Sequence, residues 1–151
     1  MDNQELLRLY STNAKALLAA ARIIPADKIT VSSGEGEWSA AYVIHHMADS
    51  EMQFGVRYSN LLSEDIPDIV PFDEAKFPAG LHYELRSVAN SLAAFEAANN
   101  LNCEILSNAV AEDWKRTALH PESGLVSLVE LVTHCGNHIG VHIEQLQRAA
   151  L

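Results

Sequence analysis

Four stretches of this chain carry apolar residues at three- and four-residue spacing, and segments rich in proline, glycine or aspartate separate them. Because an α-helix turns once in about 3.6 residues, this spacing gathers the apolar side chains on one face. Each such face must be buried against another element. The sequence therefore predicts an all-α protein with helices over Glu5 to Ile24, Ala40 to Leu62, Tyr83 to about Val110, and Ser127 through Leu146.

The helix starts and the breaks between helices have recognisable sequence patterns. Ser39 is a plausible N-cap for the second helix, and Ser127 with Glu130 fits a capping box for the fourth. Three prolines exclude regular helix from Ser63 to Gly80, and the connection from Glu112 to Gly124 is also expected to be irregular. No run competes as a strand. We expect a four-helix bundle of one domain spanning residues 1–151.

Charge and composition exclude several classes of protein. The chain has 20 acidic and 10 basic residues, a formal net charge of −10, which repels phosphate backbones and anionic membranes. The N-terminus is acidic and polar, and no segment holds about 18 consecutive apolar residues. We therefore expect a soluble, cytoplasmic protein that binds neither nucleic acid nor membrane. The two cysteines, too few for a disulfide scaffold, are expected as free thiols.

The candidate chemistry lies in the histidines. His134, His138 and His142 recur every four residues on the predicted fourth helix, and His46 lies on the apolar face of the second. Residues four apart stand one above the other on a helix. Two histidines from one helix and one from a facing helix would give three nitrogen ligands and leave open positions, as in a catalytic metal site.

A simpler interpretation of these histidines remains open. A single buried histidine is more often a hydrogen-bonded core residue than a ligand, and the pattern of two histidines four residues apart occurs by chance in many helices. Three buried imidazoles without an evident carboxylate nearby favour a shared cation, because an unpartnered buried polar group costs about 1–3 kcal/mol.

Longer motifs around these histidines resemble a known family. The run from Glu37 to Glu51, followed by Arg57, is similar to the second-helix signature of the DinB-like superfamily. The second half of the same pattern is matched by Asp113 to Arg116, by His120 to Gly124, and by the helix that ends in His138, His142 and Gln145. The resemblance extends to the subgroup that includes bacillithiol transferases. It implies a dimer-forming four-helix bundle whose metal ligands are His46, His138 and His142.

The resemblance also nominates residues around the ligands. His134 matches an additional histidine one turn before the ligand pair, expected to support the ligands or face the substrate, with coordination as the alternative. Asp49 lies three residues after His46 and could hydrogen-bond a ligand or a metal-bound water, or be a solvated helix charge. His134 and Asp49 are therefore the candidate catalytic residues.

Two neighbouring residues are expected outside the site. His45 points about 100° away from His46 on a helix. Glu51 is expected to be structural, pairing with Arg57 or with the first helix.

A divalent ion on three neutral imidazoles could lower the pKa of a bound water toward about 7 or stabilise a thiolate. Imidazole ligands suit several metals, and we expect zinc or nickel. Because characterised members of the resembled family include transferases that use low-molecular-weight thiols, we predict a homodimeric, metal-dependent thiol S-transferase, or a hydrolase, acting on a small electrophile. The alternatives are a non-catalytic metal-binding dimer related to stress and a bundle whose histidines only pack.

Overall fold

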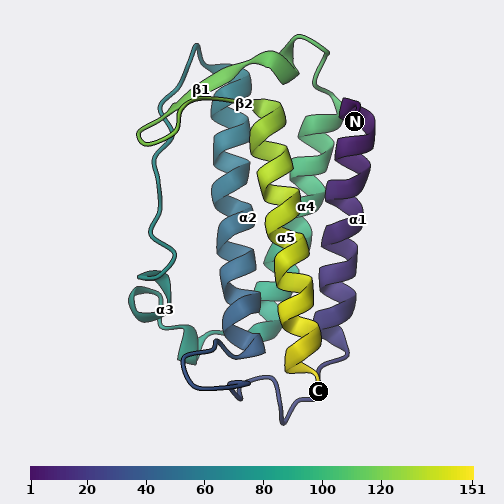
Figure 1. Ribbon diagram of the computed structural model, residues 1–151, viewed down its shortest axis with the longest axis vertical. Helices are drawn as coiled ribbons and strands as arrows, with labels where there is room; N and C mark the ends of the chain where they lie inside the picture. Colours follow the sequence, from purple (N-terminus) through teal and green to yellow (C-terminus); the bar gives the residue numbers. More distant parts are fainter.

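A computed structural model describes all residues from 1 to 151, and its four long helices form a bundle (Figure 1). These helices are α1 (Asn3–Arg22), α2 (Ala40–Ser63), α4 (Val88–Ser107) and α5 (Leu128–Ala149). The expected all-α four-helix bundle is confirmed. None of the helices combines the length and the apolarity that crossing a membrane requires.

The helices begin where local hydrogen bonding favours them. Ser39 caps α2 by accepting a hydrogen bond from the backbone N–H of Tyr42, as predicted. Ser127 and Glu130 form the predicted capping box at the start of α5. Asp2 and Ser87 cap α1 and α4 in the same way, so each long helix begins with a side chain that satisfies an otherwise free backbone N–H group.

The order of the helices in the bundle depends on a long crossing segment. In Figure 1, α1 and α5 run downward whereas α2 and α4 run upward, and the chain after α2 returns along the length of the bundle before α4 begins. Helix α1 packs against α4 and α5, and α2 packs against the same two helices. Helices α2 and α5, which carry the histidines, are therefore direct neighbours.

The core lies along the axis between the four helices. Its large members come from every long helix and include Tyr10, Tyr58, Phe95 and Ile139, each at most 1% exposed. Burial of such side chains stabilises the fold by about 1.5–3 kcal/mol each. The bundle is therefore a packed scaffold on which side chains near its surface can be held in fixed positions.

The predicted third helix was wrong at its start. Residues Tyr83–Leu85 form a separate 3-10 turn, Arg86 is extended, and α4 begins only at Val88. The apolar spacing continues across this break, but Ser87 accepts the hydrogen bond that starts a new helix. The turn packs against α2, so tertiary contacts decide its conformation.

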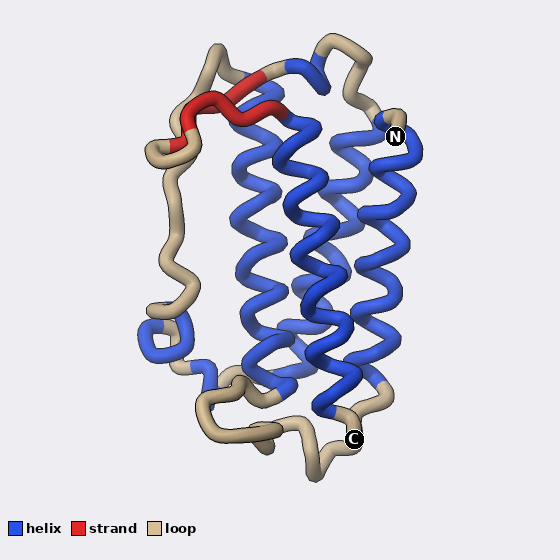
Figure 2. The backbone as a smooth tube through the Cα atoms, viewed as in Figure 1, coloured by secondary structure: helices blue, strands red, loops and turns tan.

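Both connections that we expected to be irregular contain short regular elements (Figure 2). The four-residue helix α3 (Phe77–Gly80) lies in the crossing segment and has a proline in its first turn, where the lost N–H group costs nothing. Strands β1 (Thr117–His120) and β2 (Gly124–Ser127) pair as an antiparallel hairpin at the other end of the bundle. Each strand is only four residues long, and such short segments show little alternation in sequence.

Candidate metal centre

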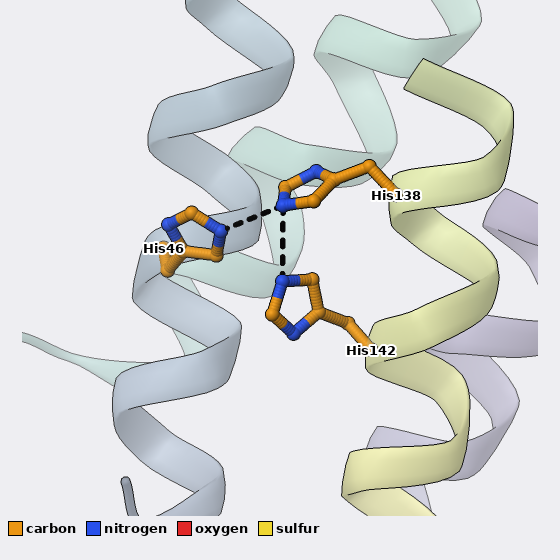
Figure 3. A group of neighbouring side chains, drawn as sticks. All are labelled: His46, His138 and His142. Carbon is orange, nitrogen blue, oxygen red and sulfur yellow. Dashed lines mark hydrogen bonds between the residues drawn. The ribbon is translucent and has the colours of Figure 1, made fainter. Parts of the chain in front are cut away.

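Three histidines from the two neighbouring helices α2 and α5 converge at one point (Figure 3). His46 lies in the second turn of α2, while His138 and His142 follow one another by one turn on α5. All three rings present Nε2 to the same space. The Nε2 atom of His138 is 3.0 Å from Nε2 of His46 and 3.0 Å from Nε2 of His142.

These distances are difficult to explain by hydrogen bonds among the histidines alone. A neutral imidazole has one N–H donor and one acceptor nitrogen, so a single Nε2 of His138 cannot make two well-directed bonds in the plane of its ring. In a tetrahedral site with zinc–nitrogen bonds of about 2.0–2.1 Å, neighbouring ligand atoms lie about 3.3 Å apart. The candidate ligand atoms of the three histidines all lie within 4.8 Å of one another, a separation compatible with ligands of one divalent cation.

The environment keeps the three imidazoles neutral, which is the form that binds metals. Burial, together with repulsion from the nearby His142, lowers the pKa of His46 to about 4. Burial, together with repulsion from His142 and His46, lowers the pKa of His138 to about 3. The pKa of His142 is lowered chiefly by burial as well. At neutral pH each Nε2 can offer a lone pair.

Neighbouring side chains fix the orientation of two of the rings. The Oε1 atom of Gln145 lies 2.8 Å from Nδ1 of His142, so Nδ1–H donates to it and the lone pair of His142 is on Nε2. Trp38 packs against His46 with ring centroids 5.2 Å apart. The Nδ1 atom of His138, by contrast, is buried without a hydrogen-bond partner.

A cavity of about 670 Å³ opens beside the cluster and includes His138 in its wall. The crossing segment closes one side of it with Phe72, Asp73 and Glu74. The Oε2 atom of Glu74 lies 3.6 Å from Nε2 of His46. The cavity thus gives a small molecule access to His138, whose Nε2 lies at the centre of the cluster.

His134 lines the same cavity but does not join the cluster. Its exposed ring is stacked parallel to that of His138, with centroids 6.4 Å apart, and on the other side it faces Phe54 at 5.8 Å. His120, whose proline-containing loop could from its sequence either approach a pocket or simply turn the chain, also lines this cavity. Both residues are thus placed to contact a bound molecule.

Asp49 lies next to the histidines in sequence but makes its contacts elsewhere. Only 6% of it is exposed, so it is not the solvated charge considered from the sequence. It accepts hydrogen bonds from the Tyr83 hydroxyl at 2.6 Å and from Nη1 of Arg86 at 2.8 and 2.9 Å. Asp49 therefore ties α2 to the segment before α4, and the structure shows no hydrogen bond from it to a clustered histidine.

Glu51 is completely buried on the opposite side of α2, and its carboxylate accepts hydrogen bonds from Tyr10 of α1 and from Asn99 and Asn102 of α4. Of the two partners predicted for Glu51, the first helix is confirmed through Tyr10, whereas pairing with Arg57 was wrong. His45 also faces away from the cluster, with Nδ1 2.8 Å from the Ser91 hydroxyl.

Sequence analysis missed the contribution of the crossing segment. Phe72 and Glu74 lie more than twenty residues after His46, within a stretch identified only by its prolines and aspartates. Nothing in the spacing of these residues relates them to a helix face. Their position depends on how the segment returns along the bundle.

Comparison with known proteins identifies the family to which the chain belongs. The family model of the DinB superfamily matches residues 9–146. A relative from Oceanobacillus iheyensis, named "Putative metal-dependent hydrolase", is 32% identical over 123 residues, covering 80% of this chain and 71% of the relative. YfiT from Bacillus subtilis, which has the same description, is 26% identical over 137 residues, covering 87% of this chain and 76% of YfiT.

Solved structures share the fold. The structure of Bacillus subtilis YfiT, described as a probable metal-dependent hydrolase with an unusual four-helix bundle topology, superposes with a TM-score of 0.81 at 24% identity, covering 97% of this chain and 86% of that one. A mycothiol-dependent maleylpyruvate isomerase superposes equally well, at 0.81, with 13% identity, covering 97% of this chain and 61% of the longer isomerase. On the family match and the identity to its relatives, the chain belongs to the DinB superfamily.

Proposed function

We propose that this protein is a divalent-metal-dependent enzyme that transfers a small thiol to an electrophilic small molecule. The observation that carries this proposal is the convergence of three neutral imidazoles, one of which, His138, lines an accessible cavity. A cluster that served only the core would not need an open cavity, and a closed structural site would use four protein ligands.

His46, His138 and His142 would hold the ion, and Gln145 would keep His142 in the tautomer that binds it. When bound, the ion supplies positive charge that stabilises a thiolate or lowers the pKa of a water molecule near neutrality. The ion would be zinc or, as second choice, nickel. Imidazole ligands accept both metals, so the cellular supply decides which one is bound.

The cavity residues would handle the substrate and the proton. Glu74, 3.6 Å from Nε2 of His46, is placed to accept the proton that the thiol loses. The sulfur then forms a bond to the electrophilic carbon, while the leaving group departs with its electron pair. His134 and His120 line the cavity and would contact the electrophile.

A structural neighbour supports the use of a thiol, since the isomerase that shares this fold is mycothiol-dependent. Hydrolysis is the second candidate, and the name of the Oceanobacillus relative favours it. The same Glu74 carboxylate would then accept a proton from the attacking water. The two reactions therefore share the cluster and the cavity and differ in the nucleophile.

The test starts from metal content. The protein, purified without a histidine tag and loaded with zinc or nickel, is incubated with 1-chloro-2,4-dinitrobenzene and, in turn, glutathione, mycothiol and bacillithiol. Metal-dependent loss of one thiol supports the transferase. Metal-dependent hydrolysis of p-nitrophenyl acetate without thiol consumption supports the hydrolase instead.

Two negative results would contradict the proposal in different ways. Stoichiometric metal binding without turnover of either kind would favour a non-catalytic metal-binding protein. Absence of bound metal would favour histidines that only pack. A Glu74→Gln variant, compared with the exposed Glu84→Gln as control, should keep its metal and lose at least tenfold in rate if Glu74 accepts the proton.

A further inference from the structure

The cavity has a cation in its wall that the proposed chemistry does not use. Arg57 of α2 lines the cavity together with Phe54 of the same helix and Phe72 of the crossing segment. The centre of its guanidinium lies 5.0 Å from the ring centroid of Phe54 and 5.3 Å from that of Phe72. The two rings hold this flat cationic group at the cavity surface.

Arg57 has no anionic partner within the protein. The molecule's ion pairs employ Arg22, Arg86, Lys76, Lys115 and two histidines, and none includes Arg57. Its Nε atom is buried and makes no hydrogen bond. A guanidinium presents its N–H donors in a planar fork that matches a carboxylate, so an unpaired one facing a cavity is poised for such a ligand.

The acidic residues of the cavity do not fill this role. Asp73, Glu74 and Glu122 also line it, but all three are exposed to solvent. Asp73 lies 3.7 Å from Nζ of Lys76, and Glu74 faces His46. These exposed carboxylates act against polyanionic ligands, because each additional negative charge on the ligand would meet like charge in the cavity wall.

Arg57 and His138, the central histidine of the cluster, line the same cavity. His46 and Arg57 are eleven residues apart on α2, which places their Cα atoms roughly 16 Å apart along the axis. Helical side chains lean toward the N-terminus, so the long arginine reaches back toward the cluster. Between them the rings of His134 and Phe54 form a continuous wall from His138 to Arg57.

We propose that Arg57 binds the carboxylate of an extended, singly anionic substrate whose reactive end lies at the three histidines. This inference deepens the proposed function and rests on it, since it names the chemical class of the electrophile. Phe54 and Phe72 would contact the apolar part of that molecule. Arg57 would act as a residue that sets substrate specificity, outside the bond-making step.

The test measures binding and needs no turnover. The ¹⁵N-labelled, metal-loaded protein is titrated with hexanoate and, separately, with hexanol, while the Arg57 Nε–H signal and the backbone amides of Phe54 and Phe72 are followed. Adipate serves as the dianionic comparison. Arg57→Gln is paired with Arg8→Gln, which removes the same charge from an exposed position on α1.

Hexanoate should bind saturably and at least tenfold more tightly than hexanol or adipate. Arg57→Gln should abolish this preference and Arg8→Gln should preserve it, with helix content unchanged in both. Equal binding of hexanoate and hexanol, a preference that survives Arg57→Gln, or no saturable hexanoate binding would overturn the inference. Metal analysis of the same samples separates the two proposals. A protein that binds no metal counts against the proposed function. A protein that binds metal normally but shows no preference for hexanoate over hexanol counts only against the role of Arg57.

Discussion

Single residues decide whether the histidine cluster can hold a metal, because each imidazole must present its lone pair inward. His142 meets this requirement through Gln145, and burial keeps His46 and His138 neutral. The sequence predicted these three histidines as ligands from their spacing and from a family resemblance. The structure brings them together, and their role as ligands is open to direct measurement.

His138 has the central position in the cluster, since its Nε2 lies 3.0 Å from both other Nε2 atoms. We expect His138→Ala to reduce bound zinc or nickel from about one ion per chain to nearly none, because two histidines on different helices form a weak site. Metal analysis by mass spectrometry after gel filtration measures this. His82→Ala, at an exposed histidine, is the matched control and should keep its metal.

Gln145 tests the orientation of a ligand without removing it. Gln145→Leu removes the acceptor for Nδ1–H of His142 and should weaken metal affinity about 10–100-fold. Competition with a chromophoric chelator gives the affinity. Gln147→Leu, at an exposed position two residues further along α5, should leave the affinity unchanged. Equal effects of the two variants would show that Gln145 does not set the tautomer of His142.

Tyr10 tests the buried carboxylate on the other side of α2. Tyr10→Phe removes one hydrogen-bond donor to Glu51 while keeping the ring packed, and should lower the free energy of unfolding by about 1–3 kcal/mol. Urea denaturation measures the change. Metal content should remain normal, since Glu51 contacts Tyr10 of α1, two asparagines of α4 and Cys135 of α5 but none of the clustered histidines.

At the scale of secondary-structure elements, capping residues predicted the starts of helices more reliably than the spacing of apolar residues did. The caps at Ser39 and Ser127 were predicted because their hydrogen bonds are local in sequence. The start of α4 was missed because the apolar spacing continues through Arg86, where the backbone is extended. The β1–β2 hairpin was missed because its four-residue strands pair only once the loop returns at Gly124, whose φ is +75°.

The capping box of α5 allows a prediction about the stability of a single helix end. Ser127→Ala removes the side chain that accepts from the backbone N–H of Glu130, and should cost about 1 kcal/mol of stability. Thermal and urea unfolding measure it. Because the cap lies about three turns before His138, metal affinity should change little, and a large loss of metal would show that the start of α5 positions the cluster.

For the whole molecule, the arrangement of the helices determines which side chains meet. The crossing segment after α2 allows α2 and α4 to run in the same direction, and it leaves α2 beside α5 (Figure 1). The same segment supplies Phe72 and Glu74 to the cavity. The connection between two helices thus also builds the site.

Removing the metal should destabilise the protein without unfolding it at room temperature. A ligand present at about one hundred times its Kd stabilises the folded state by about 2.7 kcal/mol. For a chain of this size that corresponds to a decrease in Tm of about 5–10 °C on chelation. Calorimetry with and without a chelator measures the shift, and His138→Ala should show none.

The sequence by itself determined the helical class, the approximate extent of the helices, two of their caps and the identity of the clustered histidines. These properties depend on contacts within a few residues, or on motifs that extend along one helix. Tertiary structure alone decided that Asp49 binds Tyr83 and Arg86, that Glu51 binds Tyr10 and two asparagines, and that Arg57 faces the cavity unpaired. The partners of these polar side chains come from distant segments, and only the packing of the bundle and the path of the crossing segment bring them into contact.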